Sequence, residues 1–178
     1  MKKSSKKYIK KIGILGGTFD PPHIGHLHIS NIAIRKLKLD KVIWVITKQN
    51  PLKHKPFLSV NLRLKLSKDI IDKHKKIYIK FIDNLIKSNN TFDVLNYIKK
   101  NNRNIRLFFL IGSDNLINFH KWSKWKKIPE LAKIIVFARS NYTVKALKSP
   151  AAKKLDRNDW VYINSKKMNI SSSLIRIF

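Results

Sequence analysis

Short runs of apolar, mostly β-branched residues alternate along this chain with segments of helical periodicity. The strand-like runs cover residues 12–15, 42–47, 77–81, 105–111, 134–138 and 161–163. Helical spacing is found between them, at residues 25–38, 59–73, 91–100 and 123–132. Because continuous apolar strands separated by helices are typical of a parallel sheet covered on both faces, the pattern predicts a doubly wound α/β fold. In such folds the ligand lies beyond the carboxyl ends of the strands.

The length of the chain, 178 residues, is that of one domain, so we expect residues 1–178 to form a single domain. The chain has no cysteine, which excludes disulfides and thiolate metal sites and favours a reducing, cytoplasmic compartment. Residues 3–11 are basic, but the apolar run after them is too short for a signal peptide or a membrane span. The lysine-rich residues 145–157 are expected to form a solvated loop.

The formal net charge is +29, from 39 basic and 10 acidic residues. Such an excess often indicates a nucleic-acid partner. Here the lysines are spread along the whole chain, and no interleaving of arginine with aromatic residues predicts a platform for stacked bases. We therefore interpret the charge as background composition. We expect weak adhesion to RNA at low salt and no specific nucleic-acid partner.

The most informative local motif is Gly-Gly-Thr-Phe-Asp-Pro-Pro-His-Ile-Gly-His at residues 16–26, between a strand-like run and a helical segment. Glycines let a ligand approach the backbone, and the unpaired N–H groups of a helix start favour anions. His23 and His26 can donate hydrogen bonds to phosphoryl oxygens at the same helix start. The motif therefore predicts a phosphate-binding site.

Two other interpretations of this motif are weaker. A His-x-x-His pair can ligate zinc, but no third ligand stands at a useful spacing, so we expect no metal site built from protein side chains. The loop also lacks the Gly-x-Gly-x-x-Gly pattern of dinucleotide-binding folds and the lysine and hydroxyl ending of a Walker loop. The loop therefore fits neither of these two common nucleotide-binding patterns.

Residues 16–26 resemble the signature of the nucleotidylyltransferase superfamily, whose members transfer a nucleotidyl group from a nucleoside triphosphate to a phosphate acceptor. Ile-Ser-Ser-Ser-Leu-Ile-Arg at residues 170–176 is similar to the second motif of that superfamily. The resemblance implies a Rossmann-like nucleotidyltransferase fold. It also implies that Arg176 and the N–H groups near Ser172 and Ser173 hold the β and γ phosphates of ATP.

Further segments are similar to the nicotinate-nucleotide adenylyltransferase family. Ile-Gly-Ser-Asp at residues 111–114, followed by Trp122, matches its Ile-Gly-x-Asp and Trp pattern. Thr-Phe-Asp-Val-Leu at residues 91–95 matches its Thr-x-Asp-x-Leu, and residues 50–55 lie where its substrate loop carries a His-Lys pair. Arg139 takes the place of the arginine in its Arg-Pro-Gly-Tyr turn. The resemblance covers essentially the whole chain.

This resemblance implies an enzyme of NAD biosynthesis. It would transfer AMP from ATP to nicotinate mononucleotide, giving nicotinate adenine dinucleotide and pyrophosphate, with Mg²⁺ accompanying ATP. Because the acceptor is already an ionised phosphate, such a transfer needs no strong base, and the protein must orient two polyanions and screen their repulsion. Cations and N–H donors are sufficient for that task.

The candidate residues fall into three groups. The candidate catalytic residues are His23, His26 and Arg176, with His26 expected to stabilise charge at the α-phosphoryl group. The candidate ATP-binding residues are Gly16, Gly17, Thr18, Phe19, Gly25, Gly112, Asp114, Ser172 and Ser173, with Asp114 expected to accept from ribose hydroxyls. The candidate acceptor-binding residues are Asn50, Lys55, Thr91, Trp122 and Arg139, with Trp122 expected to stack on the pyridine ring.

Several alternatives stay open at this stage. Trp122 could be a core residue, Lys55 a solvated charge and Thr91 a helix cap. Two other functions compete with the first: a phosphopantetheine adenylyltransferase, which shares the glycine loop and the serine run, and a non-catalytic nucleotide- or RNA-binding module. The sequence also leaves open the oligomeric state and the choice between nicotinate and nicotinamide, because backbone N–H groups could recognise either ring substituent.

Overall fold

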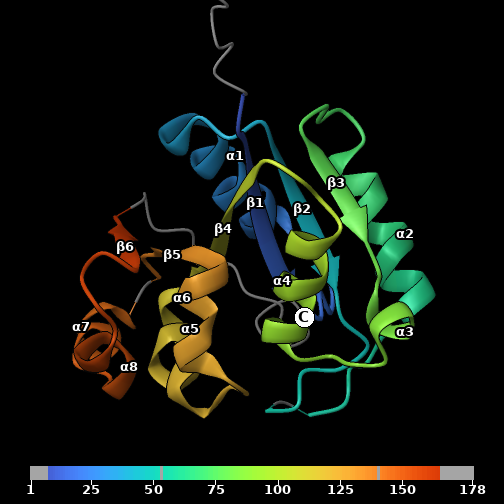
Figure 1. The fold of residues 1–178 in the computed structure, drawn as a ribbon. Coiled ribbons are helices and arrows are strands. Elements are labelled where there is room, and N and C mark those ends of the chain that lie inside the picture. Colours follow the sequence, from blue (N-terminus) through green and yellow to red (C-terminus); the bar gives the residue numbers. More distant parts are fainter. Residues whose placement is uncertain (1–7, 53, 140, 165–178) are drawn as a thin grey trace, which may run out of the picture.

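The computed structural model describes residues 8–52, 54–139 and 141–164 (Figure 1). At its centre is a six-stranded sheet with the strand order β3-β2-β1-β4-β5-β6, in which every neighbouring pair is parallel. The strands are β1 (Lys10–Gly17), β2 (Lys41–Ile46), β3 (Ile77–Lys80), β4 (Ile105–Gly112), β5 (Ala132–Phe137) and β6 (Trp160–Ile163). All six predicted strands and the doubly wound α/β fold are therefore confirmed.

The strand order reverses at β1. From β1 the sheet grows outward through β2 to β3, and it then continues on the other side of β1 with β4, so that Leu15 pairs with both Trp44 and Leu110. In open parallel sheets, a crevice for ligands forms at the carboxyl ends of the strands that flank such a reversal. Gly16 and Gly17, the last two residues of β1, lie at this edge together with residues 18–23, and we call residues 16–23 the glycine loop. Gly112 at the end of β4 lies at the same edge.

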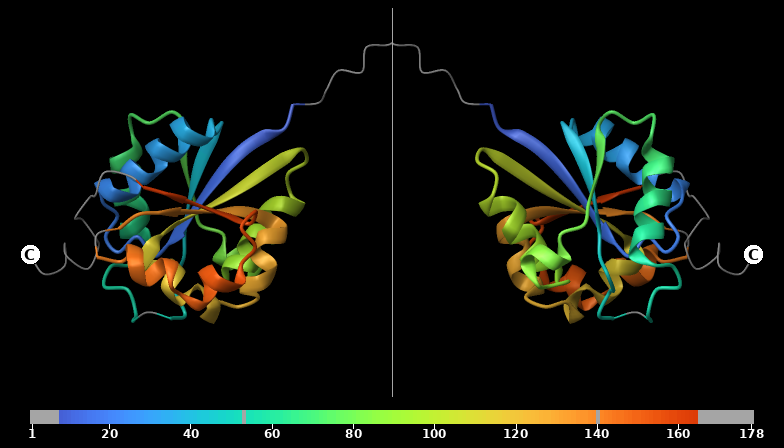
Figure 2. Two further views of the ribbon diagram at one scale, coloured as in Figure 1. Left: turned by 90° about the vertical axis from the view of Figure 1, so that its left-hand side faces the viewer. Right: turned by 90° about the vertical axis from the view of Figure 1, so that its right-hand side faces the viewer.

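Helices cover both faces of the sheet, as the two edge-on views show (Figure 2). One face carries α1 (Ile24–Leu37) and α2 (Val60–Ile71), and the other carries α4 (Thr91–Lys100), α5 (Ser113–Asn118) and α6 (Ile128–Leu131). Successive side chains of a strand point to opposite faces of the sheet. In β4, Phe109 belongs to the hydrophobic core that contains Leu95 of α4, whereas Phe108 belongs to the core on the other face, which contains Ala33 of α1. This double burial explains why the strands are continuously apolar.

Three of the four predicted helices agree with α1, α2 and α4 to within about two residues, the uncertainty expected of helix ends. The fourth prediction, residues 123–132, is only partly right. This segment contains a 3₁₀ turn, η2 (Trp125–Lys127), followed by the four-residue α6. Lys124 adopts a left-handed conformation with φ of 52°, and Pro129 cannot donate a helical hydrogen bond, so a continuous helix does not form.

The prediction that residues 145–157 form a solvated loop is wrong. They contain most of α7 (Thr143–Leu147) and all of α8 (Pro150–Lys154), and both helices pack on α5. Ala146, Ala151 and Leu155 are buried, and Ser149 caps α8 by accepting from the N–H of Ala152 at 3.2 Å. The exposed lysines between these residues hid a narrow apolar face, because small alanines contribute little to a hydrophobic pattern.

Two further short elements complete the described chain: α3 (Asp83–Ile86) and η1 (Phe119–Lys121). Across the described ranges, no helix is both long and apolar enough to cross a membrane. That residues 1–178 form one domain, and that the protein is cytoplasmic, stay predictions.

Candidate active site

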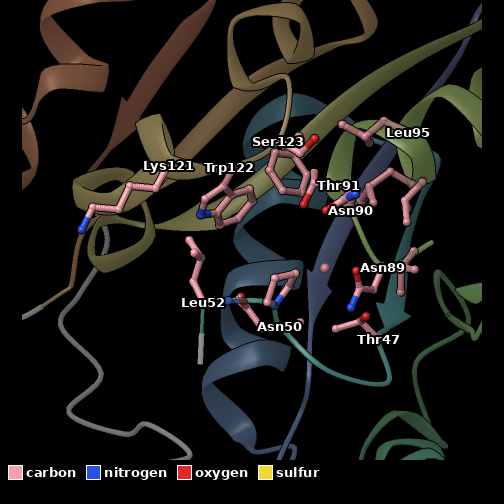
Figure 3. Close-up of a pocket in the computed structure, with 17 residues that line it drawn as sticks. Thr47, Asn50, Leu52, Asn89, Asn90, Thr91, Leu95, Lys121, Trp122 and Ser123 are labelled. Carbon is pink, nitrogen blue, oxygen red and sulfur yellow. Dashed lines mark hydrogen bonds between the residues drawn. The ribbon is translucent and has the colours of Figure 1, made fainter. Parts of the chain in front are cut away.

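A pocket with a cavity volume of about 100 Å³ opens at the carboxyl ends of β1, β2 and β4 (Figure 3). Segments that are distant in the sequence meet there: the end of β1, the loop after β2, the start of α4 and the turn after η1. The polar and glycine part of the lining comprises Gly16, Gly17, Thr47, Asn50, Asn89, Asn90, Thr91, Lys121 and Ser123. The apolar part comprises Ile14, Val45, Pro51, Leu52, Val94, Leu95, Phe109 and Trp122. The pocket thus combines an apolar wall with hydrogen-bonding groups.

The predicted acceptor-binding residues are only partly brought together. Asn50, Thr91 and Trp122 line the pocket, and Figure 3 shows Trp122 and Leu52 on the side opposite Asn89 and Thr91. Lys55 is exposed and is not part of the lining.

Trp122 belongs to both the core and the pocket. Its ring packs on Phe119 with centroids 5.1 Å apart and meets Phe109 edge-on with centroids 6.1 Å apart. It is only partly buried, and it contributes to the pocket wall. The aromatic contacts fix the orientation of the indole, so a planar ligand can lie against it without first ordering a side chain.

Thr91 does not cap α4, so the idea that it acts merely as a cap is wrong. The N-cap residue is Asn90, and it makes no side-chain capping bond. The side chain of Asn90 therefore provides no acceptor for the first-turn N–H groups of this ten-residue helix, and both Asn90 and Thr91 line the pocket. A helix N-terminus in this arrangement favours an anion.

The glycines of the loop provide space rather than an unusual backbone. No glycine in the described part of the chain has a positive φ. A Cβ atom on Gly16 would meet only the ring of Phe109, at 3.8 Å, so the position is open toward the pocket. The left-handed residue of the loop is Phe19, with φ of 51°. Its buried ring packs against His26 at 4.5 Å and Trp44 at 5.1 Å between centroids, and this packing offsets the backbone strain.

His23 and His26 form a reciprocal cap at the start of α1. Nδ1 of His23 accepts from the N–H of Gly25 at 3.1 Å, and Nδ1 of His26 accepts from the N–H of His23 at 3.2 Å. This pattern assigns the ring proton of each neutral imidazole to Nε2. Burial, with a smaller contribution from the charge of Arg139, lowers the pKa of His23 to about 4. At neutral pH His23 is therefore a neutral hydrogen-bond donor.

Asp114 and Arg139 form an ion pair at the carboxyl ends of β4 and β5. Nη1 of Arg139 lies 2.8 Å from Oδ2 of Asp114, and the backbone N–H of Arg139 donates to the hydroxyl of Ser113 at 3.0 Å. Oδ1 of Asp114 is buried without a hydrogen-bond partner among the described residues. A Cβ on Gly112 would lie 2.4 Å from that oxygen, so the glycine is needed to seat the carboxylate.

The ion pair links two groups of predicted residues. Arg139, predicted to bind the acceptor, holds Asp114, predicted to bind ATP, and its charge also acts on His23. Gly25 lies in the same capped turn as the histidines.

Ser172, Ser173 and Arg176 lie outside the described residues, so their position relative to the glycine loop stays a prediction. No group of three or more metal-binding side chains is found within the part that the structure describes.

Sequence reasoning missed the residues that support the two loops of the site. Arg63 of α2 is buried beneath Thr18, and two carboxylates, Asp20 and Asp83, hold backbone N–H groups of the loop after β2 and of the segment before α2. One feature of the sequence could have indicated Arg63. It is an arginine close to the apolar positions of a predicted helix, in a chain whose basic residues are mostly lysine.

Comparison with known proteins gives a consistent result. Residues 14–178 match the family described as cytidylyltransferase-like. A relative from Pelagibacter ubique, named "Probable nicotinate-nucleotide adenylyltransferase", is 48% identical over 166 residues, which make up 93% of this chain and 92% of the relative. A relative of the same name from Ruegeria sp. is 37% identical over 142 residues, which make up 80% of this chain and 75% of the relative.

Solved structures support the fold assignment. The nicotinic acid mononucleotide adenylyltransferase of Plasmodium falciparum, complexed with NaAD, has a TM-score of 0.77 and 24% identity to this chain. The match covers 95% of this chain and 83% of that one. At this identity the likeness concerns the fold alone, and it confirms the expected Rossmann-like nucleotidyltransferase fold.

Proposed function

This chain belongs to the cytidylyltransferase-like family and, with its relatives of up to 48% identity, to the nicotinate-nucleotide adenylyltransferases, and we propose that it transfers AMP from ATP to nicotinate mononucleotide. The products are nicotinate adenine dinucleotide and pyrophosphate. The reaction is a step of NAD biosynthesis.

The observation that carries the proposal is the meeting of two anion-binding features in one pocket. Gly16 and Gly17 line one part of it, and Asn90 and Thr91 at the start of α4 line another. The capped start of α1 follows the same glycine loop in the chain but is not part of the lining. The glycine side suits the triphosphate of ATP and the α4 side suits an anionic group on the ring of the acceptor, so the two substrates have adjacent places, as an in-line transfer between them requires.

The acceptor side suits a pyridine mononucleotide. Trp122 and Phe109 offer aromatic surface for a planar ring, while Asn50 and Asn89 offer hydrogen-bonding groups. The positive end of α4 at Thr91 favours a ring carboxylate over a neutral amide. We therefore expect nicotinate mononucleotide to be preferred over nicotinamide mononucleotide.

In the proposed reaction, a phosphate oxygen of the acceptor attacks the α-phosphorus of ATP. A new P–O bond forms, the bond from the α-phosphorus to the bridging β-oxygen breaks, and pyrophosphate leaves with that electron pair. The Nε2–H group of His26 would donate to the α-phosphoryl oxygens as charge develops there, and His23 would donate beside it. No proton needs to be removed from the acceptor.

The remaining groups position ATP. The unpartnered Oδ1 of Asp114 is the candidate acceptor for a ribose hydroxyl. Arg176 and the N–H groups near Ser172 and Ser173 are proposed to hold the departing pyrophosphate. Mg²⁺ would enter with ATP, because phosphate oxygens and water are its usual ligands at such sites and the described residues contain no three-ligand cluster.

The test is a pyrophosphate-release assay with ATP, Mg²⁺ and one of three acceptors: nicotinate mononucleotide, nicotinamide mononucleotide or phosphopantetheine. We expect the fastest release with nicotinate mononucleotide. Release with phosphopantetheine alone would replace the proposed activity by that of the sibling enzyme. No release with any acceptor, together with RNA binding that weakens steeply with salt, would identify a binding module instead.

A further inference from the structure

Arg63 is a buried cation whose partners are backbone carbonyls. Its side chain is 1% exposed, and no carboxylate lies within ion-pair distance of it in the described part of the chain. Nε donates to the carbonyl of Leu58 at 3.1 Å, Nη1 to those of Thr47 at 2.8 Å and Thr18, and Nη2 to that of Lys48 at 3.1 Å. Burying a charge is unfavourable unless its hydrogen bonds are satisfied, and this guanidinium makes four.

These four carbonyls belong to the two loops that carry the substrates. Thr18 lies in the glycine loop. Thr47 and Lys48 begin the loop after β2, which brings Asn50 and Leu52 to the pocket. A single planar guanidinium therefore ties the ATP side of the site to its acceptor side.

Two buried carboxylates fasten the same loops. Asp20 of the glycine loop accepts from the N–H groups of Phe57 at 2.8 Å and Leu58 at 2.9 Å. Asp83, at the start of α3, accepts from the hydroxyl of Thr47 at 2.7 Å and the N–H of Lys48 at 2.6 Å. Both negative charges raise the pKa of Arg63 and so oppose the larger lowering by burial. The two carboxylates therefore stabilise the charge of Arg63, although neither forms an ion pair with it in the described part of the chain.

We propose that Arg63 is a positioning residue that fixes the glycine loop relative to the loop after β2, and so sets the distance between the attacking phosphate and the α-phosphorus. The inference rests on the proposed function. Arg63 does not line the pocket, so it acts through the loops. An error of about 1 Å in the placement of reacting groups can slow a reaction about 100-fold. The hydrogen bonds from Arg63 to the two loops, which we call the Arg63 clamp, therefore act mainly on kcat.

Lysine cannot replace this clamp. Its ammonium nitrogen is a single point with three donors, whereas the four bonds of Arg63 leave from three nitrogens that fan out in a plane. We expect Arg63→Lys to keep the charge and the helix, and to lower kcat about 10- to 100-fold while changing each KM by less than about threefold.

A second variant provides a chemical test. Arg63→Ala leaves a space of guanidinium shape, so added guanidinium ion at millimolar concentration should restore part of the lost kcat. The matched control is Leu64→Ala on the same helix, which removes a side chain packed against the core but removes no hydrogen bond to either loop. Leu64→Ala should lower the melting temperature, keep kcat near the wild-type value below that temperature, and show no response to guanidinium.

The outcomes separate the clamp from a general loss of stability. A large fall in kcat for Arg63→Lys, with guanidinium rescue of Arg63→Ala, supports the inference. Wild-type kcat in Arg63→Lys would overturn it, as would losses that follow melting temperature in the same way as those of Leu64→Ala.

Amide hydrogen exchange without substrates keeps the inference separate from the proposed function. The N–H groups of Lys48 and Leu58 should exchange faster in Arg63→Lys than in the wild-type protein, because their loops are no longer tied together. A wild-type protein without turnover would overturn the proposed function and leave the clamp to this measurement. Unchanged exchange at both positions would overturn the clamp.

Discussion

The imidazole rings of His23 and His26 lie with their centroids 3.9 Å apart, and Nδ1 of His26 accepts the backbone N–H of His23. The Nδ1 atoms thus accept the hydrogen bonds that cap α1, and the Nε2–H groups on the other side of the rings can donate hydrogen bonds to a phosphate. The stability of the helix and the proposed phosphate binding therefore depend on the same two side chains. Substitutions at this turn must separate the two effects.

His26→Ala should lower kcat about 100-fold or more, because it removes the donor proposed for the α-phosphoryl group. It should also lower the free energy of unfolding by about 1 kcal/mol, since the bond from the N–H of His23 to His26 is lost while the cap made by His23 remains. Steady-state kinetics and denaturant titration measure the two effects.

The control for this prediction is His26→Gln. Glutamine at the third helical position can still accept the N–H of His23, so the stability should return to near the wild-type value. Its amide is not held where the ring Nε2 lies, so only part of kcat should return. Full activity in His26→Ala would reject a role for this residue in the transition state.

His23 makes stability depend on pH in a defined direction. Its pKa is about 4 in the folded protein, below the ordinary value of 6.5, so between these values the unfolded chain binds a proton that the folded chain does not. As pH falls from about 6.5 to 4, the free energy of unfolding should therefore decrease, by at most about 3 kcal/mol from this group. Above pH 6.5 this contribution is complete and constant.

The variant His23→Asn isolates this effect. Asparagine is a good N-cap acceptor and does not titrate in this range, so the helix keeps its cap while the pH dependence becomes shallower. Denaturant titrations of both proteins from pH 4 to 8 provide the comparison. Parallel curves for the two proteins would show that His23 is not the titrating group.

The elements that could be predicted from the sequence are those in which nearly every residue is buried. Each central strand is apolar on both faces, so its pattern needs no knowledge of its neighbours. The pattern failed where burial depends on tertiary context: Ala146 and Ala151 anchor α7 and α8 among exposed lysines, and only the position of α5 explains why. Short helices that pack through a few small side chains produce only a weak hydrophobic pattern in the sequence.

The candidate site was predicted in part for a related reason. Motifs identified several residues that line the pocket, such as Gly16, Thr91 and Trp122. The role of Arg63 in holding the loops of the site could not be predicted, because its side chain donates hydrogen bonds to backbone carbonyls of segments that are distant in the sequence. Carbonyl acceptors exist at every position, so they leave no pattern of residue types.

Gly16 and Gly13 should respond to alanine in opposite ways. A Cβ on Gly13 would lie 2.9 Å from Leu39 Cδ1 and 3.0 Å from Val42 Cγ2, so Gly13→Ala should destabilise the fold by about 1–3 kcal/mol. At Gly16 the space is open, so Gly16→Ala should keep the stability within about 0.5 kcal/mol. Its methyl group enters the pocket, so kcat/KM should fall roughly tenfold or more. Thermal melts and kinetics on both variants distinguish the two cases, and a fully active Gly16→Ala would show that ligands do not approach this backbone.

Trp122 and Trp125 form a matched pair for testing the acceptor pocket. Both rings pack on Phe119, with centroid distances of 5.1 Å and 6.2 Å, but only Trp122 lines the pocket. If a pyridine ring stacks on Trp122, then Trp122→Ala should raise the KM for nicotinate mononucleotide roughly tenfold, the value of one good aromatic contact, while the KM for ATP changes little.

Trp125→Ala removes a similar amount of aromatic packing on Phe119 and should lower the melting temperature without raising the KM for the acceptor. Trp122→Phe should recover most of the affinity, because a flat face is retained at the same position. Measurement of both KM values in all three variants is decisive. Equal effects of the two alanine substitutions on the acceptor KM would mean that Trp122 acts only through the core, and that the pyridine ring lies elsewhere in the pocket.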